Sequence, residues 1–384
     1  MIKTKVNLRD FTSAQKRSEV LEKHLNIKFD SINQFSFTEE EVAGHNIENL
    51  IGSIQIPLGV AGPLRVKGQG IRVKDYFIPC ATTEGALVAS ISRGAKAVSE
   101  AGGAKVFVED VGQTRGPVFK VKNLEHAMKV KKWIQTHIPL ISLNTQKTSS
   151  HLKLLGAKVS IVGRNLFVRF SYKTADAMGM NMVTIATEKA VELIEKKTKA
   201  ECIALAGNYD IDKKPAWLNF IEGRGKKVWA EVNLSKKIVK ETLKTTPQKI
   251  MEVVKAKAQM GSIMSGSIGF NSHFANIVAA IFAATGQDLA HVVEASLGVT
   301  DAEVLENGNL YFSIYMPSLQ VGIVGGGTHL PTQKEALKLL RVKSVLEYSQ
   351  IIGAATLAGE LSLIASLAEG TLAKAHRKLA RKNI

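Results

Sequence analysis

The sequence predicts an α+β fold with more than one structural unit, and three observations support this class. The chain has 384 residues, more than one hydrophobic core usually organises. Its hydrophobic content of 45% and charged content of 22% are those of an ordinary globular protein. Between residues 117 and 205, strand-like runs alternate with amphipathic helical stretches. We therefore expect a large mixed domain that carries a smaller inserted α+β domain.

The first 48 residues are polar and predict a short helical region. Ser13 suits the N-cap of a helix that runs through Glu22, and Thr38 followed by three glutamates predicts a second helix start. From residue 54 to 63, glycine and proline punctuate short alternating runs, which is typical of strands and turns. These runs begin the large domain, which we expect to comprise residues 49–116 and 206–384.

The inserted segment, residues 117–205, contains its own pattern. We expect strands at 119–121, 157–162 and 166–170, and helices at 125–136 and 176–196. The second helix starts with Asp176 to Met182 (DAMGMNM), directly after a strand and a turn. A glycine-containing helix N-terminus offers free N–H groups to a phosphate. Taken alone the signal is weak, because Asp176 also suits an N-cap and methionines usually fill a core.

A polar loop, Gly207 to Lys214, separates two apolar runs. Gly207 and Asn208 suit a tight turn, and Pro215 disfavours a helical conformation at Lys214. The adjacent lysines are therefore presented from a loop, where an ammonium group can meet an anion. The competing interpretation is a solvated turn, which is the commoner fate of lysine and aspartate.

Three more polar residues have both a structural and a functional interpretation. Glu84 precedes a helix predicted at 86–101 and could belong to its cap. Asp288 follows the helix terminator Gly286 and suits the N-cap of the next helix. His376 lies in a basic tail, where a histidine is usually solvated. A glycine-rich turn at 321–328 is a weak cofactor signal.

The composition of the chain limits the kinds of molecule that it is expected to bind. Lys+Arg total 51 against 34 for Asp+Glu, a net charge of +17, which suits nucleic acid, anionic lipid, dinucleotides or coenzyme A. Aromatic residues are few and not interleaved with basic ones, which argues against single-strand binding. Two cysteines and an N-terminus without an apolar signal favour a reduced, cytoplasmic location. The helix-forming C-terminal stretch at 354–380 contains Glu360, so we expect it to be buried rather than membrane-spanning.

Ten segments occur along the chain in a fixed order: ENLIG, PLGVAGPL, PCATTEGALVAS, TRGPVF, GRNLFVRF, DAMGMNM, GNYDIDKKPAWLNFIEGRGK, GSIGFNSHFANIVAAIFAATGQD, GIVGGGT and GELSLIASLAEGTLAKAH. In this order, over residues 48 to 378, they resemble the 3-hydroxy-3-methylglutaryl-coenzyme A (HMG-CoA) reductase family. The forms DAMGMNM and GELSLIASLAEG are similar to class I, the eukaryotic and archaeal type. The membrane anchor of the eukaryotic members has no counterpart here, so the resemblance implies a soluble form of prokaryotic or archaeal type.

The resemblance implies a large HMG-CoA-binding and catalytic domain and a small ferredoxin-like NADP(H)-binding domain at 117–205. The implied reaction is the four-electron reduction of (S)-HMG-CoA to (R)-mevalonate and CoA by two NADPH, a step of the mevalonate pathway of isoprenoid biosynthesis. No metal is implied. The ENLIG segment implies a contact between subunits, with active sites formed in a homodimer or homotetramer.

Four residues match the family's catalytic positions. Lys213 is expected to stabilise the oxyanion at the carbonyl that receives hydride. Glu84 is expected to donate a proton, which requires a pKa raised by burial. Asp288 is expected to hold Lys213 and Glu84 in one hydrogen-bonded network. His376 is expected to protonate the departing thiolate from a mobile tail.

The resemblance also implies two sets of binding residues. The implied substrate-binding residues are Ser90, Arg115, Asp212, Lys214, Lys257, Asn271 and Asn276. The implied cofactor-binding residues are Tyr172, Lys173, Asp176, Met178, Gly179, Met180, Asn181, Gly325, Gly326, Gly327 and Thr328.

Three positions depart from the family pattern. Lys173 stands where class I members commonly carry arginine. A lysine can meet the 2′-phosphate of NADPH as a point charge but lacks the two parallel donors of arginine, so NADH remains an alternative cofactor. Ala206 replaces a frequent serine, and Lys382 stands where animal enzymes carry a regulatory phosphoserine.

The composition and the motifs were also compared with two other classes of protein. A coenzyme A-thioester enzyme without redox chemistry leaves DAMGMNM and GGGT unused, and a nucleic-acid-binding protein does not explain the acids in glycine-rich segments.

Overall fold

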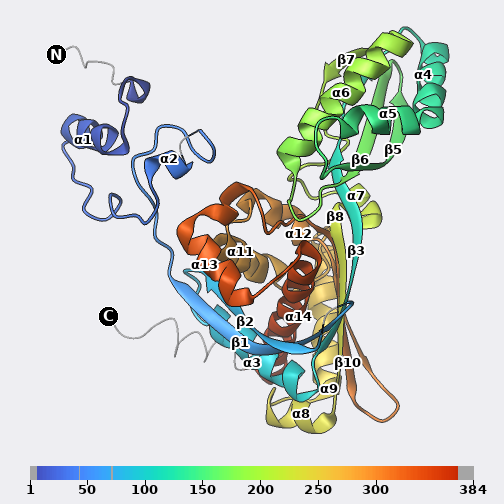
Figure 1. Cartoon of the computed structure of the whole chain (residues 1–384). Coiled ribbons are helices and arrows are strands. Elements are labelled where there is room, and N and C mark those ends of the chain that lie inside the picture. Colours follow the sequence, from blue (N-terminus) through green and yellow to red (C-terminus); the bar gives the residue numbers. More distant parts are fainter. Residues whose placement is uncertain (1–6, 43, 71, 371–384) are drawn as a thin grey trace.

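A ten-stranded mixed sheet forms the frame of the molecule, as Figure 1 shows for the computed structural model. The structure describes residues 7–42, 44–70 and 72–370. The strands are β1 Leu58–Gly68, β2 Lys74–Ala81, β3 Ala104–Arg115, β4 Val118–Lys120, β5 Lys153–Val162, β6 Asn165–Lys173, β7 Glu201–Ala204, β8 Gly225–Leu234, β9 Val299–Val304 and β10 Leu310–Leu319. The sheet runs in the order β7-β4-β6-β3-β8-β10-β9, with β1, β2 and β5 joined at the side.

Helices cover this frame. The α-helices are α1 Ala14–Leu25, α2 Glu39–Val42, α3 Leu87–Glu100, α4 Leu124–Thr136, α5 Ile138–Gln146, α6 Met180–Thr198, α7 Trp217–Glu222, α8 Lys236–Glu241, α9 Pro247–Val253, α10 Ser262–Met264, α11 Phe274–Thr285, α12 Val292–Ala295, α13 Pro331–Leu340 and α14 Val345–Glu369. The 3₁₀ segments are η1 Leu8–Asp10, η3 Leu289–His291 and η4 Gly326–His329, and η2 Val254–Gly261 is a π-helix. Most sequence-predicted elements are present, and the predicted α+β class is confirmed.

Strand β3 joins the two halves of the sheet. Its first part pairs with β8 from Lys105 to Gly112, and its last part pairs with β6 from Gln113 to Arg115. A bulge between Asp110 and Gly112 marks the change of partner. Two separate hydrophobic clusters lie on either side of this point, one built from residues 61–108 and 228–365 and the other from 119–200.

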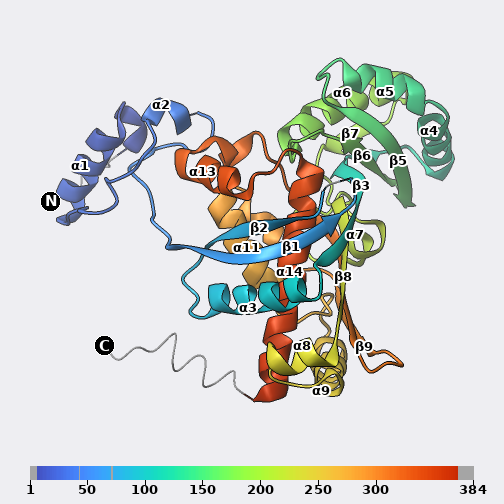
Figure 2. The same ribbon diagram turned by 60° about the horizontal axis from the view of Figure 1, so that its bottom comes forward.

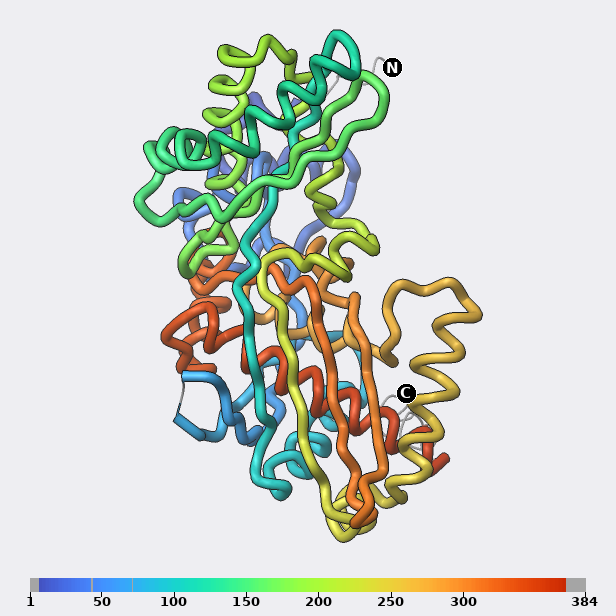
Figure 3. The backbone as a smooth tube through the Cα atoms, turned by 90° about the vertical axis from the view of Figure 1, so that its right-hand side faces the viewer, coloured from blue at the N-terminus to red at the C-terminus, as the bar shows by residue number. Residues whose placement is uncertain are grey.

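Helix α14 is the centre of the larger cluster. Nearly all of its residues are buried, and it crosses behind β3, β8 and β10 in Figure 3. It packs so closely on α3 that a Cβ added at Gly94 would stand 1.8 Å from the carbonyl oxygen of Ala358. This helix is long and apolar enough to cross a membrane, but 78% of its most apolar window is buried inside the protein. The helix expected at 354–380 is buried as predicted, but its bounds differ: α14 begins at Val345 and ends at Glu369, with the left-handed Gly370 as its C-cap. Residues 371–380 lie outside the described residues.

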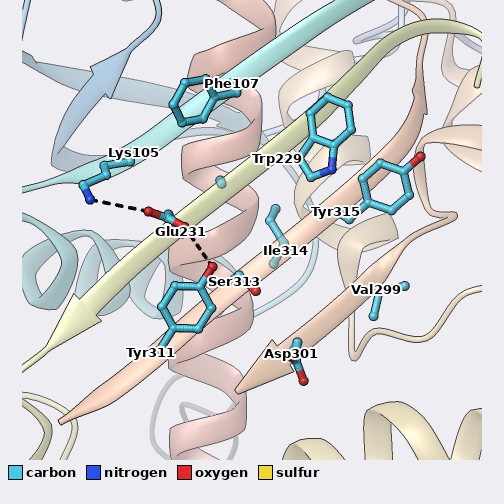
Figure 4. Close-up of a pocket in the computed structure, with 11 residues that line it drawn as sticks. Lys105, Phe107, Trp229, Glu231, Val299, Asp301, Tyr311, Ser313, Ile314 and Tyr315 are labelled. Atoms are coloured by element: carbon cyan, nitrogen blue, oxygen red, sulfur yellow. Dashed lines mark hydrogen bonds and ion pairs between the residues drawn. The ribbon is translucent and has the colours of Figure 1, made fainter. Parts of the chain in front are cut away.

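Figure 3 shows that, among the described residues, no helix covers the middle of the opposite face of the β3-β8-β10-β9 sheet. Figure 4 shows Phe107, Trp229 and Tyr315 side by side on this face, in a shallow cavity of about 190 Å³. The Trp229 and Tyr315 rings stack with their centroids 5.3 Å apart. The polar groups here are paired: Glu231 accepts a hydrogen bond of 2.8 Å from Tyr311.

The inserted segment contains all five predicted elements and two that the sequence did not predict. Strands β4, β5 and β6 and helices α4 and α6 match the expected stretches to within a few residues. Helix α5 was missed because its apolar residues are not confined to one face and Pro139 interrupts the pattern. Strand β7 was missed because it is a four-residue edge strand.

The N-terminal region packs against the large part beside α13 (Figure 2). Ser13 caps α1, as predicted, by accepting a hydrogen bond of 3.3 Å from the backbone of Lys16. Thr38 and Glu41 form a reciprocal capping box at α2. Two predictions elsewhere need correction. The expected short strands at 54–63 are one long strand, β1, which starts at Leu58, and the helix expected at 246–259 continues beyond α9 as the π-helix η2.

Candidate active site

The polar loop between β7 and α7 contains an exposed turn whose backbone is restrained by its surroundings. Three of its non-glycine residues have left-handed backbones: Asn208, Ile211 and Lys213, with φ of 61°, 55° and 56°. Each such conformation costs on the order of 1 kcal/mol or more and persists only where the surroundings impose it. For Lys213 the restraint is visible, because its backbone N–H donates a hydrogen bond to the buried carboxylate of Glu294.

The side chain of Lys213 pairs with Asp288. Its Nζ lies 2.8 Å from Asp288 Oδ2. Asp288 also caps η3 by accepting a hydrogen bond of 3.1 Å from the backbone of Ala290, so its structural and functional interpretations both apply. Burial acts to raise the pKa of Asp288, but the hydrogen bond from Lys213, the nearby His291 and the Ala290 N–H together hold it below its usual range. Lys213 and Asp288 therefore form an ammonium–carboxylate pair.

Behind this pair lies a buried ionic cluster that the sequence reasoning did not identify. The Arg224 guanidinium, completely buried, donates from Nη1 to both oxygens of Glu294 at 2.8 and 2.9 Å. The same Nη1 lies 3.0 Å from Asp212 Oδ1. His291, also completely buried, lies beside Glu294. One signal was available: Asp288, His291 and Glu294 recur every third residue, which places them on one side of a helical turn.

Lys213 and Asp288 stand on the wall of a cavity of about 830 Å³. The N-terminus of α6 and the glycine-rich turn line the same cavity. Eight predicted cofactor-binding residues are among the lining residues: Met178, Gly179, Met180, Asn181, Gly325, Gly326, Gly327 and Thr328. No side chain caps α6 at Gly179, so its first N–H groups are available to an anion. Open space surrounds the positions where a Cβ would stand on Gly325 and Gly326.

The three remaining predicted cofactor residues do not line this cavity. Tyr172 is completely buried in the core of the inserted segment, where Thr187 donates to its hydroxyl at 3.1 Å, so its side chain is not part of the cavity wall. Asp176 does not cap α6; its carboxylate accepts a hydrogen bond of 2.8 Å from the backbone of Val345, at the start of α14. Lys173 is exposed at the end of β6.

A second cavity, of about 940 Å³, contains two of the predicted substrate-binding residues. Lys257 and Asn271 line it, together with Pro215 from the polar loop. Asn271 is held by a hydrogen bond of 2.9 Å from its Nδ2 to the carbonyl oxygen of Ser296. Small residues of the 261–269 stretch form much of the remaining wall, which keeps the space open.

Glu84 has a hydrogen-bond partner of its own, separate from the Lys213–Asp288 pair. Its Oε2 accepts a hydrogen bond of 2.7 Å from Asn276, another predicted substrate residue. It does not cap α3, whose N-cap is Ala86 with no side-chain hydrogen bond, so the capping interpretation is wrong. Within the described residues no hydrogen bond joins Glu84 to Lys213 or Asp288. Glu84 is also exposed, so the described chain does not supply the burial that its expected pKa rise requires.

The other predicted residues have defined surroundings. Arg115 lies 3.5 Å from Asp210, a carboxyl group whose pKa burial raises above its usual value. Lys214 is exposed and donates to the carbonyl oxygen of Asp212 at 3.2 Å. Ser90 is held between α3 and α14 by a hydrogen bond of 3.0 Å to Ser362. His376 and Lys382 lie outside the described residues.

Taken together, these features define a class of protein. An ammonium–carboxylate pair on the wall of a cavity that also presents an uncapped helix N-terminus and a glycine-rich turn is typical of an enzyme that binds a phosphate-bearing molecule beside a reacting oxygen. The family model for hydroxymethylglutaryl-coenzyme A reductase matches residues 13–381. The chain belongs to this family of oxidoreductases.

Archaeal relatives share about half of their residues with this chain. The 3-hydroxy-3-methylglutaryl-coenzyme A reductase of Methanocaldococcus jannaschii is 50% identical over 374 residues, which cover 95% of this chain and 92% of the relative. That of Pyrococcus horikoshii is 48% identical over 375 residues, covering 95% and 91%. Among solved structures, the class II enzyme from Streptococcus pneumoniae, bound to NADPH in open conformations, matches with a TM-score of 0.70 at 19% identity, covering 94% of this chain and 98% of that one. At this identity the likeness shows the fold.

Proposed function

We propose that this protein reduces (S)-HMG-CoA to (R)-mevalonate and CoA with two NADPH, as a step of the mevalonate pathway. The observation that carries the proposal is the position of Lys213 and Asp288 on the same cavity wall as the α6 N-terminus and the glycine-rich turn. A thioester reduction needs a cation at the carbonyl oxygen where negative charge develops, and an anchor for the pyrophosphate of the hydride donor. The cavity offers both.

Bound NADPH would supply the hydride. Lys213, held in position by its ion pair with Asp288, would stabilise the oxyanion formed at the thioester carbonyl and again at the aldehyde. Glu84, paired with Asn276, is the proposed proton donor of the aldehyde step, and His376 the proposed acid for the departing thiolate. The second cavity, with Lys257 and Asn271, is proposed to hold part of the substrate.

We propose that NADPH is preferred over NADH and that its pyrophosphate lies at the start of α6. Two features of the chain support this placement: the uncapped helix N-terminus and the open space over Gly325 and Gly326. The structure of the S. pneumoniae relative with NADPH also supports the choice of cofactor. Lys173 is the proposed contact to the 2′-phosphate, because it is exposed at the end of the strand that leads into α6.

We further propose that the large part, residues 49–116 and 206–384, and the inserted part, 117–205, are the substrate and cofactor domains of a class I enzyme. The separate hydrophobic clusters support the division into two domains. The sequence forms DAMGMNM and GELSLIASLAEG, which are similar to class I, support the class. Self-association is proposed because Ile54, Leu58 and Phe77 are 79%, 56% and 51% exposed around β1 and β2. A partner subunit on this surface would also cover exposed Glu84.

The proposed function is tested by mixing purified protein with HMG-CoA and either NADPH or NADH, and following nicotinamide absorbance. Oxidation of NADPH that depends on HMG-CoA is expected, with mevalonate and free CoA thiol as products. Absence of oxidation with both cofactors would refute the assignment. Release of CoA thiol without cofactor oxidation would instead support a thioester enzyme that lacks redox chemistry. Light scattering on the same sample measures whether the active species is a dimer or a tetramer.

A further inference from the structure

His291 lies completely buried behind the Lys213–Asp288 pair. Its ring Nε2 is 3.6 Å from Asp288 Oδ2 and 3.9 Å from Asp212 Oδ1, and has no hydrogen-bond partner. Its Nδ1 is 3.3 Å from Glu294 Oε2. Both ring nitrogens therefore face carboxylate oxygens in a place that solvent does not reach. The catalytic roles proposed above do not use this residue.

The neighbouring hydrogen bonds determine where the protons lie. Glu294 accepts hydrogen bonds from Arg224 on both of its oxygens and another from the backbone of Lys213, so it is ionised. An ionised carboxylate only accepts, so Nδ1 of His291 must carry a hydrogen toward it. If Nε2 lacked a hydrogen, its lone pair would face the oxygens of Asp288 and Asp212 at 3.6 and 3.9 Å. A proton on Nε2 turns both repulsive contacts into attractive ones.

The charge balance gives the same result. Three carboxylates surround the ring, from Asp212, Asp288 and Glu294, and two permanent cations accompany them, Lys213 and Arg224. These five groups together carry one excess negative charge. Buried Arg169, whose hydrogen bonds go to neutral groups and which interacts electrostatically with Arg224, offsets part of it from farther away. A proton on His291 compensates the remainder at the ring itself, where the three carboxylates meet.

Charged groups farther from the ring have other partners. Arg115 pairs with Asp210 at 3.5 Å, and Arg169 donates to Asn219 and to the carbonyl oxygen of Gly223 at 2.9 Å each. Within the described residues neither arginine contacts His291. The charged groups near the ring are therefore Asp212 and Lys213 of the polar loop, Arg224 just before β8, Asp288 before η3 and Glu294 of α12.

We propose that His291 is positively charged in the resting protein and acts as a positioning residue for the Lys213–Asp288 pair. As an imidazolium it attracts Asp288 from the interior side, while Lys213 attracts it from the cavity side. Asp288 is thereby held ionised and in place, and its ion pair keeps the ammonium group of Lys213 in position. No covalent bond forms or breaks at His291. The charge state rests on the geometry, and its effect on rate rests on the proposed reductase function.

The charge state is tested directly by NMR on the full-length protein labelled with ¹⁵N-histidine. His291→Gln identifies the signal of His291, and His151→Gln, which removes an exposed histidine just before β5, is the matched control. We expect both ring nitrogens of His291 to carry protons at neutral pH. A signal from an unprotonated ring nitrogen would overturn the proposal. If His291→Gln does not fold, slow proton exchange assigns the signal in the unaltered protein, since His291 is the one buried histidine among residues that the structure describes.

The positioning role is tested by kinetics of the same variants. Glutamine keeps a hydrogen-bonding group but cannot carry the charge, so His291→Gln should lower kcat about tenfold while KM for HMG-CoA changes less than about twofold. The alkaline side of its kcat–pH profile should become less steep, because one ionisation is lost. His151→Gln should match the unaltered protein. An unchanged pH profile, or a loss confined to KM, would refute the role. A protonated ring in a protein without reductase activity would refute the proposed function and leave the charge state standing.

Discussion

Replacing Arg224 by methionine tests the buried ionic cluster. Methionine fills a similar space but removes the charge. Arg224 and Glu294 are both completely buried, and their carboxylate–guanidinium contact has two hydrogen bonds of 2.8 and 2.9 Å. The variant also loses the hydrogen bond of 2.8 Å from Arg224 Nε to Thr114. Removing one partner of a buried pair leaves the other charge uncompensated, so Arg224→Met should lower the free energy of unfolding by about 3–5 kcal/mol.

The measurement is urea denaturation at neutral pH, with the free energy taken from the midpoint and slope. The matched control is Arg65→Met, since Arg65 makes a similar contact of 2.9 Å with Asp75 but both side chains are about 40% exposed (43% and 40%). The control should leave the free energy of unfolding nearly unchanged. The double variant Arg224→Met/Glu294→Met should recover part of the loss, because it removes both charges. If Arg224→Met costs no more than the control, the buried pair does not form in solution.

Three further predictions concern the cavity. Lys213→Ala should lower kcat by about 10²- to 10³-fold, the effect of losing one oxyanion-stabilising group. Its circular dichroism spectrum should be unchanged. A decrease in kcat of less than about tenfold would exclude the oxyanion role. The pKa of Asp288 is lowered in the folded chain, so its pairing stabilises the protein at pH values above the ordinary pKa of aspartate. This contribution disappears as the pH falls through the lowered pKa. In urea denaturation, Asp288→Asn should therefore be slightly less stable than the unaltered protein at neutral pH and equally stable in strong acid. Lys173→Ala should lower the ratio of kcat/KM for NADPH to that for NADH, Lys173→Arg should raise it, and equal ratios in all three proteins would exclude Lys173 as the phosphate contact.

Local sequence signals predicted much of the fold. The caps at Ser13 and Thr38, the termination of α11 at Gly286 and the alternating pattern of 117–205 depend on neighbouring residues, and the structure contains these features. Helix α5 and strand β7 depend instead on packing against the rest of the inserted segment, so periodicity did not reveal them.

The candidate site was only partly predictable. Asp176 and Tyr172 lie in or next to the matched DAMGMNM segment, but the structure uses one to hold the start of α14 and the other to fill a core. Glu84 and Lys213 were expected in one network, yet in the described chain Glu84 contacts Asn276. A motif specifies which residue types are present, whereas side-chain direction follows from the backbone and its neighbours.

By itself, the sequence determined the α+β class, the polar loop around Lys213 and the family resemblance, because these depend on residue type and spacing. Only the tertiary structure showed that the α6 N-terminus and the glycine-rich turn line one cavity with Lys213 and Asp288. Only the tertiary structure revealed the cluster of Arg224, His291 and Glu294. The physical reason is that an ion pair acts over a few ångströms in space, whereas groups that meet here, such as Lys213 and Glu294, are 81 residues apart in the chain.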